Sequence, residues 1–154
     1  MKVLIKSTWW VFLLSCCSVS LALAATPPDW NKQQIDWHGY QEGLAQAKES
    51  GKPVMLIFYA DWCPTCHAYK NVFNKPNIVA LAQQLVMIRI NVDQFPALSE
   101  QYGDDGGYVP RTFVLNSSGE RQQDLFPQKR HRYFIKAKNI SAFELLMKKA
   151  LSRS

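Results

Sequence analysis

Three runs of apolar residues along the chain each have the length of a β-strand. The first, Val54–Tyr59, is apolar at every position, as expected for a central strand that is covered on both faces. A second run spans 85–92 and a third spans 112–115. Beyond the turn at 116–119, apolar positions continue up to Ile135 and predict a hairpin with one or two final strands.

Helical spacing of apolar residues predicts helices between and after these strands. The first helix is indicated by Trp37, Tyr40, Leu44 and Ala47, and Gly51 with Pro53 ends it. Further helices are expected over 63–73 and 78–84, with a short one ending near Tyr102. The last helix is predicted by the apolar stripe of Phe143, Leu146, Met147 and Ala150.

A capping box formed by Ser141 and Glu144 is expected to begin this last helix. The resulting order is helix, strand, helix, strand, helix, hairpin and helix. It predicts an α/β fold in which helices cover both faces of a central mixed β-sheet.

The N-terminal segment predicts export. Residues 1–24 have a signal peptide's basic start, apolar core and small-residue cleavage site at Ala22-Leu23-Ala24. An uncleaved anchor and a lipoprotein attached through Cys16 are the alternatives. Residues 25–36 are polar and contain prolines, so we expect a flexible lead-in to one domain over 37–154. The protein would then be periplasmic or secreted.

The sequence Trp62-Cys63-Pro64-Thr65-Cys66 stands between the first apolar strand and a predicted helix. This position puts the first thiol at a helix N-terminus, where free backbone N–H groups and the helix dipole favour the thiolate. Cys66, one turn further on, can attack a mixed disulfide on Cys63 and release the reduced partner. The spacing therefore predicts a redox-active disulfide, Cys63–Cys66.

Two other chemistries are compatible with a C-x-x-C sequence. A zinc site needs four ligands, and His38, His67 and His131 are the further soft ligands, at no spacing typical of a metal site. The run from Cys63 to His67 also matches the attachment signature of a c-type haem. Such a haem would use His67 as axial ligand, with Met55, Met87 or Met147 as the sixth ligand. The buried strand and the tryptophan before the motif favour the redox pair, with no cofactor or metal.

Charge is distributed unevenly along the chain. Residues 25–120 contain 7 basic and 10 acidic residues, a net charge of −3, whereas 121–154 contain 9 basic and 2 acidic residues, a net charge of +7. A solvated basic face is the default interpretation, and an anionic partner or membrane surface is the alternative. Export argues against nucleic acid as a partner.

The W-C-x-x-C sequence after a buried strand, with Val109-Pro110 entering a later strand, resembles the thioredoxin fold over residues 37–150. The stretch 51–63 resembles the C-terminal thioredoxin-like domain of DsbD, a periplasmic electron-delivery protein. The stretch 105–111 is similar to the anterior-gradient group of the endoplasmic reticulum. Cys-Pro-Thr-Cys is also found in thiol reductants of cytochrome c maturation.

The resemblance implies roles for individual residues. Cys63 would be the attacking thiol and Cys66 the resolving thiol. Pro110 would be a cis-proline facing the disulfide, with the backbone of Val109 pairing with an extended substrate. Trp62 would shield the site. An ordinary trans turn proline and a core-packing tryptophan are the alternatives for Pro110 and Trp62.

One position departs from thioredoxin. Ile57 stands where thioredoxin has a buried aspartate that helps to move the proton of the buried thiol. Cys66 would then need water or a nearby carboxylate such as Asp61 as its base. His67, as an imidazolium, would stabilise a thiolate, or it is simply a surface histidine.

Together these features predict a monomeric, exported thiol–disulfide oxidoreductase acting on disulfide-bearing or thiol-bearing proteins. The likeness to an electron-delivery domain favours the reducing direction, with a membrane electron donor as a candidate source of electrons. A disulfide oxidase or isomerase and a non-catalytic client-binding module are the alternatives.

Overall fold

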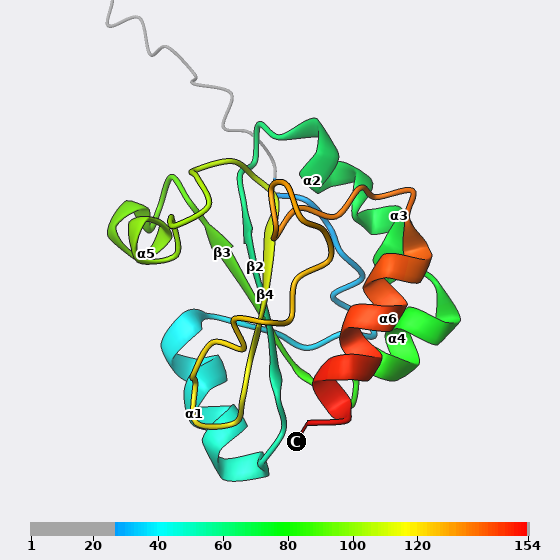
Figure 1. Ribbon diagram of the computed structural model, residues 1–154. Coiled ribbons are helices and arrows are strands. Elements are labelled where there is room, and N and C mark those ends of the chain that lie inside the picture. Colours follow the sequence, from blue (N-terminus) through cyan, green and yellow to red (C-terminus); the bar gives the residue numbers. More distant parts are fainter. Residues whose placement is uncertain (1–26, 154) are drawn as a thin grey trace, which may run out of the picture.

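A four-stranded mixed sheet forms the middle of the molecule (Figure 1). The structure is a computed structural model and describes residues 27–153. The strands are β1 (Trp37–His38), β2 (Val54–Tyr59), β3 (Val86–Asn91) and β4 (Arg111–Leu115), in the order β1-β3-β2-β4. β2 pairs parallel with β3 and antiparallel with β4. All six residues of β2 are buried, as predicted for a central strand.

Helices cover both faces of this sheet, which confirms the predicted α/β architecture (Figure 1). The helices are α1 (Tyr40–Ser50), α2 (Pro64–Ala68), α3 (Lys70–Phe73), α4 (Pro76–Ala82), α5 (Pro96–Gln101) and α6 (Ile140–Leu151). α1 and α5 lie on one side of the sheet, and α2, α3, α4 and α6 lie on the other (Figure 1).

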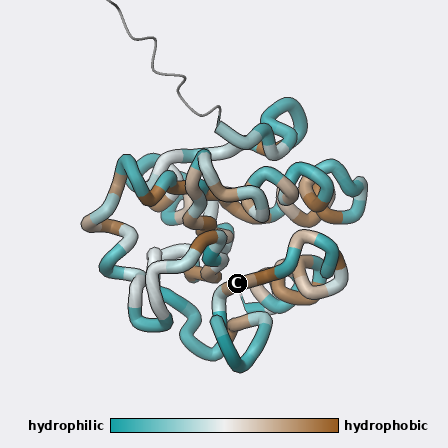
Figure 2. The backbone as a smooth tube through the Cα atoms, turned by 90° about the horizontal axis from the view of Figure 1, so that it is seen from above, coloured by the Kyte–Doolittle hydropathy of each residue, from teal (hydrophilic) through white to brown (hydrophobic). Residues whose placement is uncertain are grey.

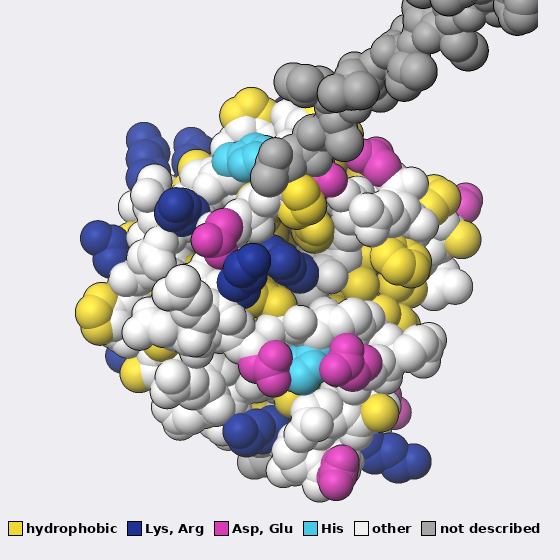
Figure 3. All heavy atoms as spheres, turned by 180° about the vertical axis from the view of Figure 1, so that it is seen from behind, with side chains coloured by type: hydrophobic (Ala, Val, Ile, Leu, Met, Phe, Trp, Pro, Cys, Tyr) yellow, Lys and Arg dark blue, Asp and Glu magenta, His cyan; other side chains and the backbone are white. Residues whose placement is uncertain are grey.

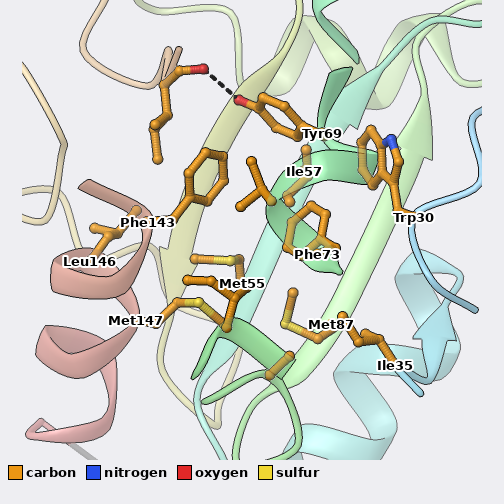
Figure 4. Packing of buried hydrophobic residues seen from close by; sticks show 14 of the residues in the cluster. Trp30, Ile35, Met55, Ile57, Tyr69, Phe73, Met87, Phe143, Leu146 and Met147 are labelled. Carbon is orange, nitrogen blue, oxygen red and sulfur yellow. Dashed lines mark hydrogen bonds between the residues drawn. The ribbon is translucent and has the colours of Figure 1, made fainter. Parts of the chain in front are cut away.

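Strand alternation divides the buried side chains into two cores, because successive residues of a strand point to opposite faces. The first core contains Met55 and Ile57 of β2 and lies under α2, α3, α4 and α6 (Figure 4). The second core contains Leu56 and Phe58 of β2 and lies under α1. Seen from above, the apolar stretches run through the interior and the polar ones through the outer loops (Figure 2).

The helix boundaries differ from the sequence expectation at several places. The helix expected over 63–73 is divided at Tyr69 into α2 and α3, and the one expected over 78–84 is α4, which begins at Pro76 and ends at Ala82. Trp37 lies in β1, and α1 begins only at Tyr40. The expected capping box of α6 is wrong, because Asn139 caps this helix by accepting a hydrogen bond from the backbone N–H of Ala142 at 3.2 Å. Glu144 instead forms an ion pair with Lys148 at 2.6 Å.

The expected final hairpin is reduced to a single antiparallel bridge between Leu115 and Arg121, which closes the turn at 116–119. In the part of the chain that the structure describes, no strand follows β4. An irregular segment, 116–139, bonds the outer edge of β4 at separate points: Gln122 N–H donates to Val114 O at 2.8 Å, and Thr112 N–H donates to Tyr133 O at 2.7 Å. The segment inserts apolar side chains into both cores, with Leu125 and Ile135 in the first and Tyr133 in the second.

The described part of the expected flexible lead-in, residues 27–36, packs against the domain. Trp30 is fully buried and lies near Tyr69 and Phe73 (Figure 4). Its ring also contacts those of Trp37 and Tyr59. Arg89 of β3 donates to Pro28 O at 2.8 Å and lies over the Trp30 ring. The packed domain therefore includes residues before Trp37, because the large apolar side chain of Trp30 is buried in the first core.

The expected signal peptide, 1–24, lies outside the described residues. Among residues 27–153, the helices are all too short or too polar to cross a membrane.

Candidate active site

Cys63 and Cys66 lie just beyond the carboxyl end of the central strand β2. The chain turns after Tyr59, and Cys63 becomes the N-cap of α2, with Pro64 in the first turn of the helix. The two cysteines form a disulfide, with Cα atoms 5.2 Å apart. This is the placement that the sequence predicted, and it follows from a buried strand that anchors one side of the motif and a helix that starts within it.

The two sulfur atoms differ in their surroundings. Cys63 is 4 % exposed, whereas Cys66 is completely buried in the first core. Cys63 Sγ accepts a hydrogen bond from the backbone N–H of Cys66 at 3.2 Å, an interaction that favours a thiolate. A partner approaching from solvent therefore reaches Cys63 first.

The loop before β4 faces this disulfide. The Val109–Pro110 peptide bond is cis, as the resemblance implied. The carbonyl oxygen of Val109 lies 3.8 Å from Cys63 Sγ. Val109 is half-buried and Pro110 is buried, so the tertiary fold brings together the two motifs that are 47 residues apart in the sequence.

A buried arginine that sequence analysis did not single out holds this loop in place. Arg111 is fully buried, and its guanidinium donates to the carbonyl oxygens of Ser99 at 3.2 Å, Tyr102 at 2.9 Å and Gly106 at 3.2 Å. Its charge also lies over the Phe58 ring. Burial lowers the pKa of Arg111. A cation directly after Pro110, at the start of a strand in which every residue is buried, is the sequence signal that could have indicated this anchor.

A second polar group fastens the same loop to the segment after β4. Tyr108 donates a hydrogen bond to Asp105. Arg121 forms a two-point ion pair with Asp104, at 2.7 and 3.0 Å. The hydrogen bond from Arg121 holds the pKa of Asp104 below its usual value. The loop before the cis-proline is thus held by a bond within it, from Tyr108 to Asp105, and by an ion pair to the segment after β4, from Arg121 to Asp104.

Trp62 stands beside the disulfide with 64 % of its surface exposed, which excludes the alternative of core packing. Its Nε1 donates to Asp93 Oδ2 at 2.9 Å. The ring is therefore held in one orientation and remains open to a partner.

Asp61 and His67 lie on either side of the motif. His67 is exposed, and its Nε2 donates to the backbone carbonyl oxygen of Asp61 at 2.6 Å. Asp61 Oδ1 is buried, with no hydrogen-bond partner in the described part of the chain. Ile57 is fully buried in the core that also contains both cysteines. The wall beneath Cys66 is therefore apolar where thioredoxin has a carboxylate.

Trp30 is a further contact of the motif that sequence analysis missed. Its Nε1 donates to the backbone carbonyl oxygen of Cys66 at 2.7 Å, entirely within the core. A tryptophan within the polar stretch 25–36 was the available signal.

The geometry disfavours the metal and haem alternatives. Within residues 27–153, no three His, Cys, Asp or Glu side chains are grouped so that they could hold a metal ion. The methionines considered as second axial ligands lie deep in the first core, whereas His67 lies on the outer side of α2. A disulfide next to a cis-proline loop can instead exchange with a thiol or disulfide of another molecule.

Several known proteins are similar to this chain. A model of the thioredoxin-like family matches residues 36–117, which is more than half of the chain. The anterior gradient protein 2 homolog of Pongo abelii is 32 % identical over 124 residues, 79 % of this chain and 69 % of that protein. The thiol:disulfide interchange protein DsbD of Vibrio vulnificus is 45 % identical over 53 residues, 34 % of this chain and 9 % of that protein.

Among solved structures, a disulphide isomerase from Xylella fastidiosa Temecula1 is similar, with a TM-score of 0.54 and 27 % identity. The match covers 71 % of this chain and 86 % of that one. The family model covers more than half of the chain, and sequence and fold similarity agree with it, so the chain belongs to the thioredoxin-like family.

Proposed function

We propose that this chain is an exported thiol–disulfide oxidoreductase that reduces disulfides of protein partners through Cys63 and Cys66. The Cys63 thiolate attacks one sulfur of the partner's disulfide, forms a mixed disulfide and releases the other sulfur as a thiolate. The Cys66 thiolate then attacks Cys63 Sγ, which releases the second partner sulfur and leaves the Cys63–Cys66 disulfide. The partner gains two electrons, and the two released thiolates take up two protons.

The observation that carries this proposal is the position of Cys63 between a helix start and the Val109 carbonyl. A substrate segment that pairs with the backbone at Val109 would bring its disulfide to the more exposed sulfur. Trp62, held by Asp93, would supply an apolar contact on the other side.

Cys63 is the N-cap of α2 and accepts the backbone N–H of Cys66, which favours the thiolate that attacks the partner's disulfide. The similarity of one segment to a thiol:disulfide interchange protein supports the reducing direction.

Asp61 is assigned as the proton acceptor for Cys66, because its buried Oδ1 lacks a partner and Ile57 supplies no carboxylate. Replacing Asp61 with Asn should slow the resolving step and shift its pH dependence. A Glu49→Gln variant serves as the matched control, since it also removes one carboxylate and Glu49 is exposed on α1, on the other side of the sheet.

We further propose that the protein is a monomer, that residues 1–24 direct its export to the periplasm or the exterior, and that a membrane-bound dithiol donor reduces the pair again. A neutral or acidic protein surface is the expected partner, and nucleic acid is not.

A redox titration of the pair in dithiothreitol and glutathione buffers tests the direction. The titration is followed by Trp62 fluorescence and verified by thiol alkylation. We expect a midpoint near the ~−270 mV of thioredoxin. A midpoint of about −120 to −180 mV would assign the protein as an oxidant or isomerase instead.

Disulfide isomerisation is the second candidate, favoured by the 27 % identity to a solved disulphide isomerase over most of the chain. An isomerase would restore activity to a protein with scrambled disulfides at catalytic concentration. A reductase would only reduce that protein, and a client-binding module would bind it without either reaction.

A further inference from the structure

A groove runs alongside the active-site helix, on the side that the redox chemistry leaves unused. One wall is formed by α2 and the other by the segment that leads into α6. The lining is mainly apolar and includes Pro64, Ala68, Phe134, Ala137 and Ile140. Pro64 and Thr65, which stand between the two cysteines, both lie in this wall.

Three exposed lysines, Lys75, Lys136 and Lys138, also line the groove. In the described part of the chain, none of them forms an ion pair. The surface near α3 and the start of α6 is rich in cations: Figure 3 shows Lys and Arg side chains gathered there, at the upper left.

Four of the seven other cations of the basic C-terminal region form ion pairs within the chain, which are Arg121, Arg132, Lys148 and Arg153. The basic excess is thus not a uniform solvated face, because internal carboxylates neutralise part of it. Two of the unneutralised charges, Lys136 and Lys138, flank an apolar groove.

The groove is continuous with the cis-proline loop. The ring of Phe134, which lines the groove, lies edge-on to the ring of Tyr108 with centroids 6.4 Å apart. Tyr108 directly precedes Val109, whose carbonyl faces Cys63. A peptide with its disulfide at Cys63 would therefore have a path into the groove.

We propose that this groove binds an acidic segment of the protein substrate, one in which carboxylates alternate with apolar side chains next to the reactive disulfide. The carboxylates would pair with the three lysines and the apolar side chains would lie on the floor. This inference rests on the proposed function and adds the substrate class to it. Because exposed charge pairs act mainly on encounter and partner choice, the groove would select among substrates.

Two synthetic peptides with the same internal disulfide test the proposal. One continues with Glu-Leu-Glu-Leu-Glu and the other with Gln-Leu-Gln-Leu-Gln. We expect the wild-type protein to reduce the acidic peptide with a kcat/KM about tenfold higher at low salt, as three exposed charge pairs of modest strength would produce. The preference should decrease toward one at about 1 M salt, where charges are screened.

The triple variant Lys75→Gln, Lys136→Gln, Lys138→Gln should bring the ratio of the two kcat/KM values close to one. The matched control Lys129→Gln, Arg130→Gln, Lys149→Gln removes three other cations of the C-terminal region and should keep the tenfold ratio. A wild-type ratio near one, or an equal loss in both triple variants, would overturn the proposal.

A binding measurement separates the groove from the redox chemistry. Both peptides are made with serine in place of cysteine, and their affinity for the protein is measured by fluorescence anisotropy. Failure to reduce either disulfide peptide would refute the proposed function alone, while tighter binding of the acidic peptide, lost in the groove variant, would still support the groove.

Binding of the acidic peptide that is unchanged in the groove variant would refute the groove alone. Vesicles containing phosphatidylglycerol provide the remaining comparison. If the groove variant loses binding to them without any change in peptide preference, the lysines contact lipid and the proposal is wrong.

Discussion

Replacing Trp30 with alanine tests whether residues 27–36 belong to the folded domain. The side chain is 0 % exposed, and its ring centroid lies 5.2 to 5.6 Å from those of four other aromatic rings. Removing such a side chain from a core costs about 3–5 kcal/mol in the free energy of unfolding. A domain of this size has about 5–15 kcal/mol in total, so the loss would be a large fraction. With a urea m-value of about 2 kcal/mol/M, the midpoint should fall by about 2 M.

A Trp30→Phe variant separates packing from the hydrogen bond to Cys66. It retains an aromatic ring but loses the Nε1 donor, which lies 2.7 Å from the Cys66 carbonyl oxygen. That oxygen also accepts from Tyr69 N–H at 3.2 Å, so it keeps one partner. We expect a loss of about 1–2 kcal/mol, or about 0.5–1 M in the urea midpoint.

Unfolding is followed by circular dichroism, because removing Trp30 would alter a fluorescence signal. The oxidised form of each variant is compared, with Gln33→Ala as a control for the same segment. Gln33 is exposed, and its replacement should change the free energy of unfolding by less than about 0.5 kcal/mol. A Trp30→Ala midpoint within about 0.5 M of the wild type would refute the reasoning and restore the domain start at Trp37.

The other predictions concern the redox pair, the buried arginine and pH. Cys63→Ser should abolish disulfide reduction, whereas Cys66→Ser should accumulate mixed disulfides detectable by non-reducing electrophoresis; a fully active Cys66→Ser protein would contradict the two-step mechanism. Arg111→Met should lower the free energy of unfolding by about 3 kcal/mol, because three carbonyl oxygens, including the buried one of Tyr102, lose their charged donor. Urea unfolding measures the loss, and a midpoint equal to that of wild type would show that the carbonyls need no such donor. The hydrogen bond from Arg121 lowers the pKa of Asp104 in the folded protein below its unfolded value of about 4. The ion pair therefore stabilises the fold fully above about pH 4, and this stabilisation is lost as the pH falls through the lower folded-state pKa. Asp104→Asn should therefore cost up to about 1 kcal/mol at pH 7 and nothing near pH 2, and an equal cost at both pH values would argue against the ion pair.

Local patterns in the sequence were sufficient to predict much of the fold. The apolar run Val54–Tyr59 is the buried central strand, and Gly51, with φ 71°, ends α1. These predictions succeeded because a strand's burial and a helix's end are decided by neighbouring residues. The C-x-x-C motif belongs to this group, since strand, cysteines and helix are contiguous.

The failures share a physical cause. Asn139 and Ser141 are both good N-cap residues, and the choice between them depends on how the preceding segment reaches the sheet. The hairpin was expected from the turn at 116–119 and the apolar positions after it, whereas the apolar side chains of 116–139 are distributed between two cores.

What the sequence by itself determined is the α/β order, the central strand and the redox pair at a helix start. The tertiary structure decided what surrounds that pair: Trp30 beneath it, the Val109 carbonyl beside it and Arg111 behind the cis-proline loop. These contacts join residues far apart in the chain, and no local period or cap encodes them. They arise because folding brings separate segments to the same end of one sheet, where burial requires each polar group to find a partner.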